Sequence, residues 1–278
     1  AMSLDGVEIM TNSSGSHHEL RKLNKRLDLI LNATKRCGGV YLYANLRGCD
    51  GDRLYYDGCA LIAINGTIVA QGSQFSLDDV EVVTATVDLE EVRSYRAAVM
   101  SRGLQASLAE IKFKRIDIPV ELALMTSRFD PTVCPTKVRE PFYHSPEEEI
   151  ALGPACWMWD YLRRCNGTGF FLPLSGGIDS CATAMIVHSM CRLVTDAAQN
   201  GNEQVIKDVR KITRSGDDWI PDSPQDLASK IFHSCFMGTE NSSKETRNRA
   251  KDLSNAIGSY HVDLKMDSLV SSVVSLFE

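Results

Sequence analysis

Several patterns that would point to other classes of protein are missing from these 278 residues. The nine cysteines are an odd number and form no Cys-x-x-Cys pair or metal-type spacing, so reduced thiols in an intracellular compartment are expected. No apolar run is long enough to span a bilayer. The formal net charge of −6 gives no general electrostatic reason to expect nucleic-acid binding. We therefore expect neither a membrane nor a nucleic acid as a partner.

The composition that remains is ordinary for a globular protein, with 44% hydrophobic and 24% charged residues. The length favours two domains or two partial domains. A proline-rich stretch of little periodicity, residues 116–145, predicts a linker between domains at 1–115 and 146–278. The chain opens almost directly on a strand-like run, Val7–Met10, and ends on an apolar pattern with no terminator. We expect it to be a piece of something longer.

The first region predicts a mixed α/β domain. Leucines and isoleucines recur at helical spacing over residues 20–31, and a short strand is expected over 40–45. The Asn-Gly dipeptide inside residues 59–70 predicts a β-hairpin with a type I′ turn. A further strand is expected over 80–89, because β-branched residues are enriched there, and a helix over 90–102.

The second region predicts a parallel sheet, because strands alternate with helices, and ligands then bind at the carboxyl ends of the strands. Ser145-Pro146 starts the first of these helices with a serine cap and a proline at the first helical position. A polar insertion, roughly residues 195–223, is expected to be mobile. The expected elements are helices at 145–165, 178–194, from 223 onward and 245–257, and strands at 170–174, 231–237 and 260–264.

The most informative stretch is Leu172–Ser180, an apolar strand end followed by a Ser-Gly-Gly turn and a helix from about Ile178. The glycines let the backbone approach a ligand, and the helix N-terminus supplies unpaired N–H groups. The hydroxyls of Ser175 and Ser180 add donors, and Asp179 adds a carboxylate for a magnesium ion. The stretch predicts a phosphate-binding loop, although no Walker motif occurs in the chain.

Two other interpretations of this stretch were weighed. A glycine turn between a buried strand and a helix needs no ligand, but the full six-residue pattern argues against so plain a role. A serine-hydrolase elbow also places a serine between a strand and a helix, but it requires glycine two residues before the nucleophile. Pro173 stands at that position, which excludes the elbow.

Several segments resemble known families. Ser175–Ser180, with the pattern Ser-Gly-Gly-x-Asp-Ser, resembles the pyrophosphate loop of the N-type ATP pyrophosphatases. Cys235–Thr246 and Ile257–His261 resemble the second strand, its loop and the next strand of NAD synthetases. The first half is similar to the nitrilase-type glutaminase domain of eukaryotic glutamine-dependent NAD synthetases, close to the fungal forms. The segments that carry this similarity are Gly6–His18, Gly48–Gly58 and Ala70–Asp79.

The resemblance implies a carbon–nitrogen ligase that makes NAD with glutamine as the nitrogen donor. Nicotinic acid adenine dinucleotide would offer its pyridine carboxylate to the α-phosphate of ATP, so that an adenylate forms and pyrophosphate leaves. Ammonia released from glutamine would then attack the adenylate. The implied fold is α/β, a partial nitrilase-like sandwich followed by a partial parallel-sheet ATP pyrophosphatase (adenine nucleotide alpha hydrolase-like) domain.

The same resemblance assigns roles to individual residues. Ser175 is the expected catalytic residue, and Asp179 is the expected ligand of Mg²⁺. Ser16 would contact the substrate glutamine, with a plain turn serine as the alternative. The pyrophosphate portion of ATP would be held by Ser175, Gly176, Gly177 and Ser180. The whole expected ATP-binding run is Pro173, Leu174, Ser175, Gly176, Gly177, Ile178, Asp179 and Ser180.

The chain departs from the family in two respects. Nitrilase-type glutaminases use a Glu-Lys-Cys triad, and the Cys-Glu-Glu/Asp-x-Trp context of the nucleophile does not occur here. Cys49 is not expected to replace it, because the flanking Asp50 and Asp52 would raise its pKa. By the resemblance, the carboxyl half of the synthetase domain is also missing. We predict that the isolated chain neither hydrolyses glutamine nor makes NAD at a useful rate.

Two groups of residues could suggest metal sites, but a structural role is expected for each. The run Asp50-Gly-Asp52 with Asp57 lacks the spacing and terminal glutamate of an EF-hand and predicts a polar loop. The adjacent His17 and His18 are expected to lie at a helix start, because neighbouring side chains rarely point at one ion.

Three other functions stay open at this point. They are a different N-type ATP pyrophosphatase amidotransferase, such as a GMP or asparagine synthetase, a non-catalytic ATP-binding fragment, and a plain amidohydrolase. The family also implies a homo-oligomer and a cytoplasmic location, with the nucleus as a second compartment.

Overall fold

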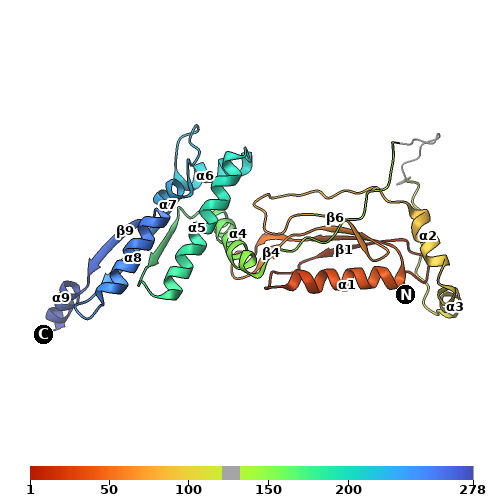
Figure 1. The fold of residues 1–278 in the computed structure, drawn as a ribbon, viewed down its shortest axis with the longest axis horizontal. Helices are drawn as coiled ribbons and strands as arrows, with labels where there is room; N and C mark the ends of the chain where they lie inside the picture. Colours follow the sequence, from red (N-terminus) through yellow and green to blue (C-terminus); the bar gives the residue numbers. More distant parts are fainter. Residues whose placement is uncertain (121–131, 278) are drawn as a thin grey trace. The chain divides into compact units, whose positions relative to one another are not determined.

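A computed structural model describes residues 1–120 and 132–277, and the chain divides into two compact units. Figure 1 shows the course of the chain through them. Two short segments from the first half of the sequence belong to the second unit, which no sequence pattern indicated. The first unit is made of Ala1–Leu46, Asp57–Gln74 and Val80–Ser145, and the second of Arg47–Tyr56, Phe75–Asp79 and Pro146–Glu278.

The first unit is built on a four-stranded sheet with the order β1-β2-β5-β6, in which β1 and β2 are parallel and the other pairs antiparallel. Its strands are β1 (Ile9–Ser14), β2 (Val40–Asn45), β5 (Leu61–Ile64) and β6 (Thr67–Gln71). Its helices are α1 (Lys22–Cys37), α2 (Leu89–Ala97) and α3 (Met100–Leu108).

Helix α1 packs on this sheet through one apolar side. Leu23, Leu27 and Ile30, at helical spacing, are buried in one cluster with side chains of β2, β5 and β6. The predicted hairpin is confirmed, with Asn65 and Gly66 both at positive φ (50° and 94°) as a type I′ turn requires.

Three predictions for this unit were wrong in detail. The strand expected at Val7–Met10 begins later, at Ile9. The helix expected over 90–102 is two helices, α2 and α3. Residues 80–88 form no strand in the described structure, although Val83, Ala85 and Val87 pack against a buried cluster. The valines and threonines of this segment favour an extended backbone, but that backbone joins no ladder of the sheet.

The second unit contains a three-stranded parallel sheet with the order β7-β8-β9. The strands are β7 (Phe170–Pro173), β8 (Phe232–Gly238) and β9 (Tyr260–Lys265). The short strands β3 (Arg47–Cys49) and β4 (Tyr55–Asp57) pair separately as a hairpin. The helices are α4 (Pro146–Cys165), α5 (Ile178–Gln199), α6 (Glu203–Thr213), α7 (Pro224–Ile231), α8 (Lys244–Ile257) and α9 (Asp267–Phe277).

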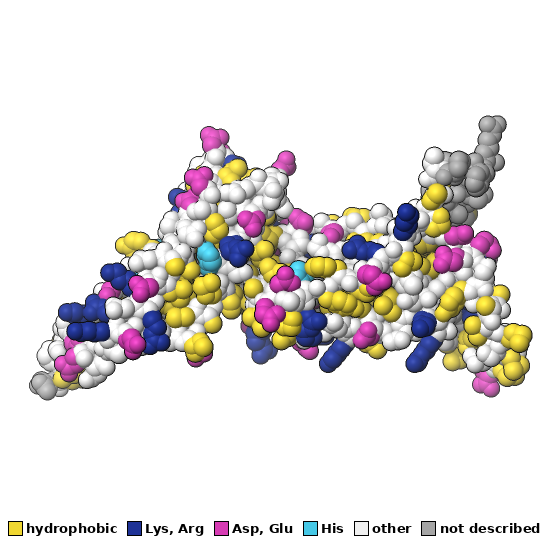
Figure 2. All heavy atoms as spheres, in the orientation of Figure 1, with side chains coloured by type: hydrophobic (Ala, Val, Ile, Leu, Met, Phe, Trp, Pro, Cys, Tyr) yellow, Lys and Arg dark blue, Asp and Glu magenta, His cyan; other side chains and the backbone are white. Residues whose placement is uncertain are grey.

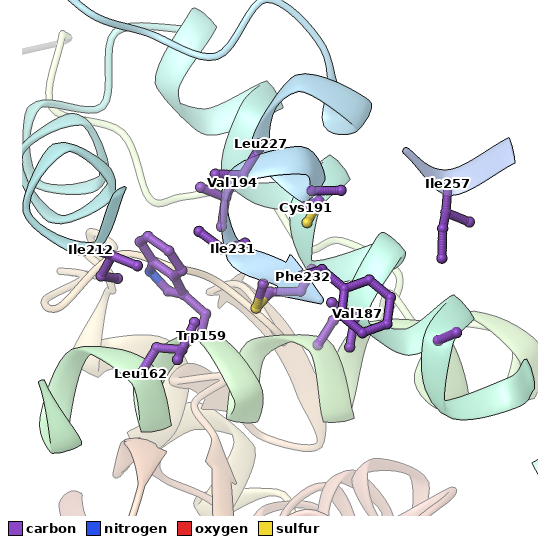
Figure 3. Packing of buried hydrophobic residues seen from close by; sticks show 14 of the residues in the cluster. Trp159, Leu162, Val187, Cys191, Val194, Ile212, Leu227, Ile231, Phe232 and Ile257 are labelled. Carbon is purple, nitrogen blue, oxygen red and sulfur yellow. The ribbon is translucent and has the colours of Figure 1, made fainter. Parts of the chain in front are cut away.

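The main core of this unit lies among α4, α5, α6, α7, α8 and β8. Figure 3 shows Trp159 of α4 with Ile212 of α6 and Ile231 of α7 beside it, and all three side chains are buried. Phe232, at the start of β8, is fully buried in the same cluster. Burial of this apolar surface is the main term that stabilises the arrangement.

The polar insertion was wrongly expected to be mobile. Helix α5 runs through to Gln199, and α6 follows within the insertion. Asn202 caps α6, and Val205, Val209 and Ile212 recur on one face that is buried in the core. These three apolar residues were outweighed in the sequence by the many polar ones around them.

The expected linker, residues 116–145, is described in part. Residues 121–131 of the expected linker lie outside the described residues, and Arg139 and Phe142 of its later part bond to β6 in the first unit. Within the described ranges, no helix is long and apolar enough to cross a membrane.

Candidate functional site

The predicted phosphate-binding loop lies between β7 and α5, at the carboxyl end of the parallel strand. Gly176 has a φ of +75°, and a Cβ built on it would lie 2.0 Å from the carbonyl oxygen of Thr246. Only glycine fits this position, because it alone tolerates both the left-handed backbone and the close approach. The loop is therefore pressed against the first turn of α8.

The hydroxyl groups of the loop hold one another in place. The Oγ atoms of Ser175 and Ser180 are 3.0 Å apart, and the N–H of Gly177 donates to Ser175 Oγ at 3.2 Å. Ser180 Oγ donates to the carbonyl of Gly177 at 3.1 Å. The two serines predicted to bind phosphate are thus brought together at the N-terminus of α5.

Two helix N-termini meet at this edge of the sheet. The N–H of Leu174 donates to the carbonyl of Cys235, which joins the ends of β7 and β8. Helix α8 begins soon after β8, with the Ser243 side chain accepting from the N–H of Thr246 as its cap. Unpaired N–H groups at helix N-termini attract anions, so this edge suits the phosphates of a nucleotide.

The other residues of the predicted ATP-binding run differ in their exposure to solvent. Asp179 is exposed in the first turn of α5, where its carboxylate is accessible to a cation. Pro173 and Ile178 are exposed, whereas Leu174 is fully buried and anchors the loop in the core. Leu174 therefore holds the loop on the core and is not available to contact a ligand.

Magnesium is compatible with the residues present. Among the described residues, no cluster of three or more His, Cys, Asp or Glu side chains could hold a metal by itself. Mg²⁺ is commonly bound through one or two carboxylates together with substrate phosphates, and the exposed Asp179 beside a phosphate-binding loop matches that arrangement.

The second candidate site lies in the first unit, where α1 faces β1 and β2. A cavity of about 470 Å³ is lined there by Ser14 and Ser16 and by the cationic Lys22, Lys25 and Arg26, with Glu19 as the one acid. In Figure 2, Lys and Arg side chains line the region where Figure 1 draws α1. Such a lining suits a small polar ligand that carries a carboxylate.

Ser16 is held in this cavity through three of its atoms. Its N–H donates to Asn45 Oδ1 at 2.8 Å, and its carbonyl accepts from Asn45 Nδ2 at 3.0 Å. Its hydroxyl accepts from Arg26 Nη2 at 3.2 Å. The predicted glutamine contact is thus fixed by residues of α1 and β2.

A fully buried carboxylate, Asp57, lies behind these partners. It accepts from Arg26 Nη2 at 3.0 Å, Asn45 Nδ2 at 3.2 Å and Gln74 Nε2 at 2.8 Å, and His18 Nδ1 is 3.7 Å away. Burial by itself raises the pKa of Asp57, but the neighbouring His18, the Arg26 charge and the hydrogen bonds from Gln74 and Arg26 outweigh it and hold the pKa below its usual value.

Neither Cys49 nor Cys59 has the character of a nucleophile. Burial raises the pKa of Cys49, and the nearby carboxylates of Asp160 and Asp50 raise it further. Burial also raises the pKa of Cys59 to about 11. Of the two acids expected to raise the pKa of the Cys49 thiol, Asp50 does so, but burial is the larger cause and Asp52 is not among the contributors.

Sequence reasoning missed the residues that organise Ser16. Asp57 was grouped with Asp50 and Asp52, yet those two are exposed whereas Asp57 is buried. His17 pairs with Glu19 at 2.8 Å, while His18 faces Asp57. Asp57 ends β4, whose residues alternate between buried and partly buried positions, but the sequence Tyr55-Tyr56-Asp57 shows no such alternation.

Comparisons with known proteins agree with these features. The carbon–nitrogen hydrolase family model matches residues 1–97. The glutamine-dependent NAD(+) synthetase of Mus musculus is 54% identical over 99% of this chain, and the chain spans 37% of that relative's length. The relatives that match also include a fungal protein.

Two solved structures share the fold. The glutamine-dependent NAD(+) synthetase of Cytophaga hutchinsonii aligns with a TM-score of 0.70 and 22% identity over 99% of this chain and 39% of its own. That of Acinetobacter baumannii, in complex with ADP, aligns with a TM-score of 0.64 and 18% identity over 99% of this chain and 37% of its own. The expected α/β fold is confirmed, and the chain is homologous to a segment of glutamine-dependent NAD(+) synthetases.

Proposed function

We propose that this chain is the segment of a glutamine-dependent NAD(+) synthetase in which the glutaminase part meets the synthetase part. Residues 1–115 would belong to the glutaminase domain, 116–145 to the linker and 146–278 to the ATP pyrophosphatase domain. The whole enzyme would amidate nicotinic acid adenine dinucleotide to NAD, with ATP as the activating substrate and glutamine as the source of ammonia. The identity of 54% with relatives of that name supports this activity.

The observation that carries the proposal is the loop at Ser175–Ser180 between two helix N-termini. Backbone N–H groups of α5 and the paired hydroxyls of Ser175 and Ser180 would stabilise negative charge on the pyrophosphate as it leaves the adenylated substrate. The backbone N–H groups lie in place before the substrate binds, whereas the two hydroxyls would turn from their partners within the loop toward the phosphate. The ADP in the Acinetobacter baumannii structure supports an adenine nucleotide as the ligand.

Asp179 is the proposed residue for Mg²⁺. The ion would neutralise charge on the ATP phosphates and supply no other chemistry here. Asp179 would orient the ion from the first turn of α5, and Ser175 would align the α-phosphate for attack by the substrate carboxylate.

In the first unit, Ser16 is the proposed contact for the glutamine substrate. Of the three cations that line the cavity beside it, Lys22 pairs with Glu19 and Arg26 with Asp57, so Lys25 is the side chain proposed to attract the α-carboxylate of an amino acid. The nucleophile of glutamine hydrolysis is not among the residues assigned here, because the pKa values of Cys49 and Cys59 are raised.

The test is NAD formation by this chain extended at both ends to the length of its relatives. ATP, magnesium and nicotinic acid adenine dinucleotide would be supplied with ammonium in one series and glutamine in the other. We expect NAD from both series and loss of both on Asp179→Ala. Product from ammonium alone would contradict the glutaminase assignment, and no product from either would contradict the whole proposal.

The isolated 278-residue chain supplies a second test. We expect it to bind ATP weakly at most, to release no glutamate from glutamine and to form no NAD. Glutamate release by the purified chain would contradict this expectation. ATP binding without turnover in the extended chain would instead favour a non-catalytic nucleotide-binding role.

Two further properties belong to this proposal. By analogy with the family, the enzyme would form a homo-oligomer and act in the cytoplasm, with the nucleus as a second compartment. Sedimentation of the extended chain and its localisation in cells would test them separately.

A further inference from the structure

Ser16 is unusually well held for a serine in a turn. Its N–H and carbonyl bond to the same side-chain amide of Asn45, and its hydroxyl bonds to Arg26. A serine in a loop commonly hydrogen-bonds its own neighbouring backbone, whereas these partners lie 10 and 29 residues away in the sequence. The turn that contains Ser16 is therefore fixed in both its backbone and its side chain.

The two residues that hold Ser16 are both hydrogen-bonded to one oxygen of Asp57. Arg26 Nη2 donates to Asp57 Oδ1 at 3.0 Å and Asn45 Nδ2 donates to the same atom at 3.2 Å. Gln74 Nε2 holds the other oxygen, Oδ2, at 2.8 Å. Asp57 is 0% exposed and Arg26 only 7%, so this charge pair lies out of bulk solvent.

Stability alone is a weak reason for such a pair. Burying two charges costs desolvation energy, and an apolar pair of the same volume is often as stable or more stable. A buried charge pair can instead fix one conformation when its bonds are shared within one network. Arg26 Nη2 donates to both Asp57 Oδ1 and Ser16 Oγ, and Asn45 Nδ2 donates to both Asp57 Oδ1 and the Ser16 carbonyl. Here the conformation that is fixed includes a side chain lining a cavity, Ser16.

We propose that Asp57 is a positioning residue for the glutamine site, which holds the hydroxyl and backbone of Ser16 in place through Arg26 and Asn45. This inference rests on the proposed function, because it takes glutamine as the ligand of Ser16. Asp57 itself does not touch the substrate. Its carboxylate sets the orientation of two side chains, and these set the geometry of the contact.

The experiment uses the extended chain and compares Asp57→Asn with the parent. Glutamine-dependent NAD formation gives KM and kcat for glutamine, and ammonium-dependent formation reports on the synthetase site. We expect the KM for glutamine to rise about tenfold or more, the kcat for glutamine to change less than about twofold, and the ammonium-dependent rate to stay unchanged. Asp52→Asn, at an exposed position in the same segment, is the matched control and should leave all three unchanged.

Asp57→Asn leaves the buried Arg26 without its counter-charge and could therefore misfold. A second variant tests the proposal without removing that charge. Asn45→Ala keeps the Arg26–Asp57 pair and removes the bonds to the backbone of Ser16. A similar rise in the KM for glutamine would support the proposal. An unchanged KM in a folded Asp57→Asn variant would overturn it, and so would an unchanged KM in Asn45→Ala.

Failure of the proposed function would look different. If the parent forms no NAD from glutamine, the glutamine site itself is wrongly assigned and Asp57 has no such ligand to position. If the parent uses glutamine and the variants match it, only the role of Asp57 is wrong.

Discussion

The two candidate sites are built in opposite ways. The site of the second unit is one run of consecutive residues, Pro173–Ser180, in which backbone groups and short hydroxyls face the ligand position. The site of the first unit brings together side chains from distant parts of the sequence, with Ser16, Arg26, Asn45 and Asp57 in one network. The fold of the first kind of site should tolerate loss of a side chain but not an added Cβ, whereas the fold of the second kind should depend on its side chains.

The largest effect is expected on removing the carboxylate of the first unit. Asp57→Ala leaves the buried guanidinium of Arg26 without a counter-charge, and breaking such a pair costs about 3–5 kcal/mol. Urea unfolding followed by hydrogen exchange at α1 amides would measure the loss. Asp52→Ala, whose carboxylate is 75% exposed, should change stability by less than about 0.5 kcal/mol. Equal losses of unfolding free energy in Asp57→Ala and Asp52→Ala would contradict the idea that the site of the first unit depends on its buried side chains.

An added methyl group should have the next largest effect, in the second unit. Gly176→Ala places a side chain at φ +75° against the carbonyl oxygen of Thr246. The strained backbone alone costs about 1–3 kcal/mol, and the clash adds to it by pushing the loop away from α8. Thermal unfolding of the second unit and ATP binding should both be impaired. Gly216→Ala, where nothing lies within 4 Å of the added Cβ, is the matched control.

The same difference explains what the sequence could predict. The loop was found because its pattern, strand and helix are all local, and Ser175, Gly177 and Ser180 lie within six residues of one another. The network around Asp57 was not found, since Asn45 and Gln74 reach it only after the hairpin and the sheet have formed. Sequence reasoning gives the backbone of a local motif but not which distant polar side chains share a buried space.

The errors in the fold follow the same rule. Helix α6 was missed because only Val205, Val209 and Ile212 mark its buried face within a polar segment. The assignment of Arg47–Tyr56 and Phe75–Asp79 to the second unit depends on contacts with α4, such as the bond from Cys49 N–H to Asp160 at 3.1 Å. No periodicity in those short segments could indicate such a partner.

A smaller effect is expected when one hydroxyl of the loop is removed. Ser175→Ala and Ser180→Ala each delete one donor to a charged phosphate, a bond that contributes about 1.5 kcal/mol. ATP binding to the extended chain should weaken about tenfold, while the unfolding free energy changes by less than about 0.5 kcal/mol. Titration calorimetry and urea unfolding would measure the two. A large loss of stability would mean that the hydroxyl pair, and not the backbone, holds the loop.

The smallest predicted effect is a loss of stability at low pH, which should begin at a different pH in each unit. Asp57 has a lowered pKa, so its contribution to stability is present above the unfolded value near 3.9 and is lost only as the pH falls through the folded value. Burial lowers the pKa of His261, whose Nδ1 is 2.9 Å from Ser234 Oγ. For His261 the neutral form is favoured by folding, so its contribution is present above about pH 6.5 and declines below it.

The second unit should therefore begin to lose stability at a higher pH than the first. Tryptophan fluorescence reports on the second unit alone, since Trp157, Trp159 and Trp219 all belong to it. Between pH 7.5 and 5.5 its melting temperature should fall. Burial also lowers the pKa of His188 in the same unit, so His261→Gln should reduce that dependence without abolishing it, whereas exchange at α1 amides should change little. If His261→Gln leaves the pH dependence of the melting temperature intact, the buried cluster around Ser234 is not the source of that dependence. The two units would then differ in how their sites are built and not in their response to pH.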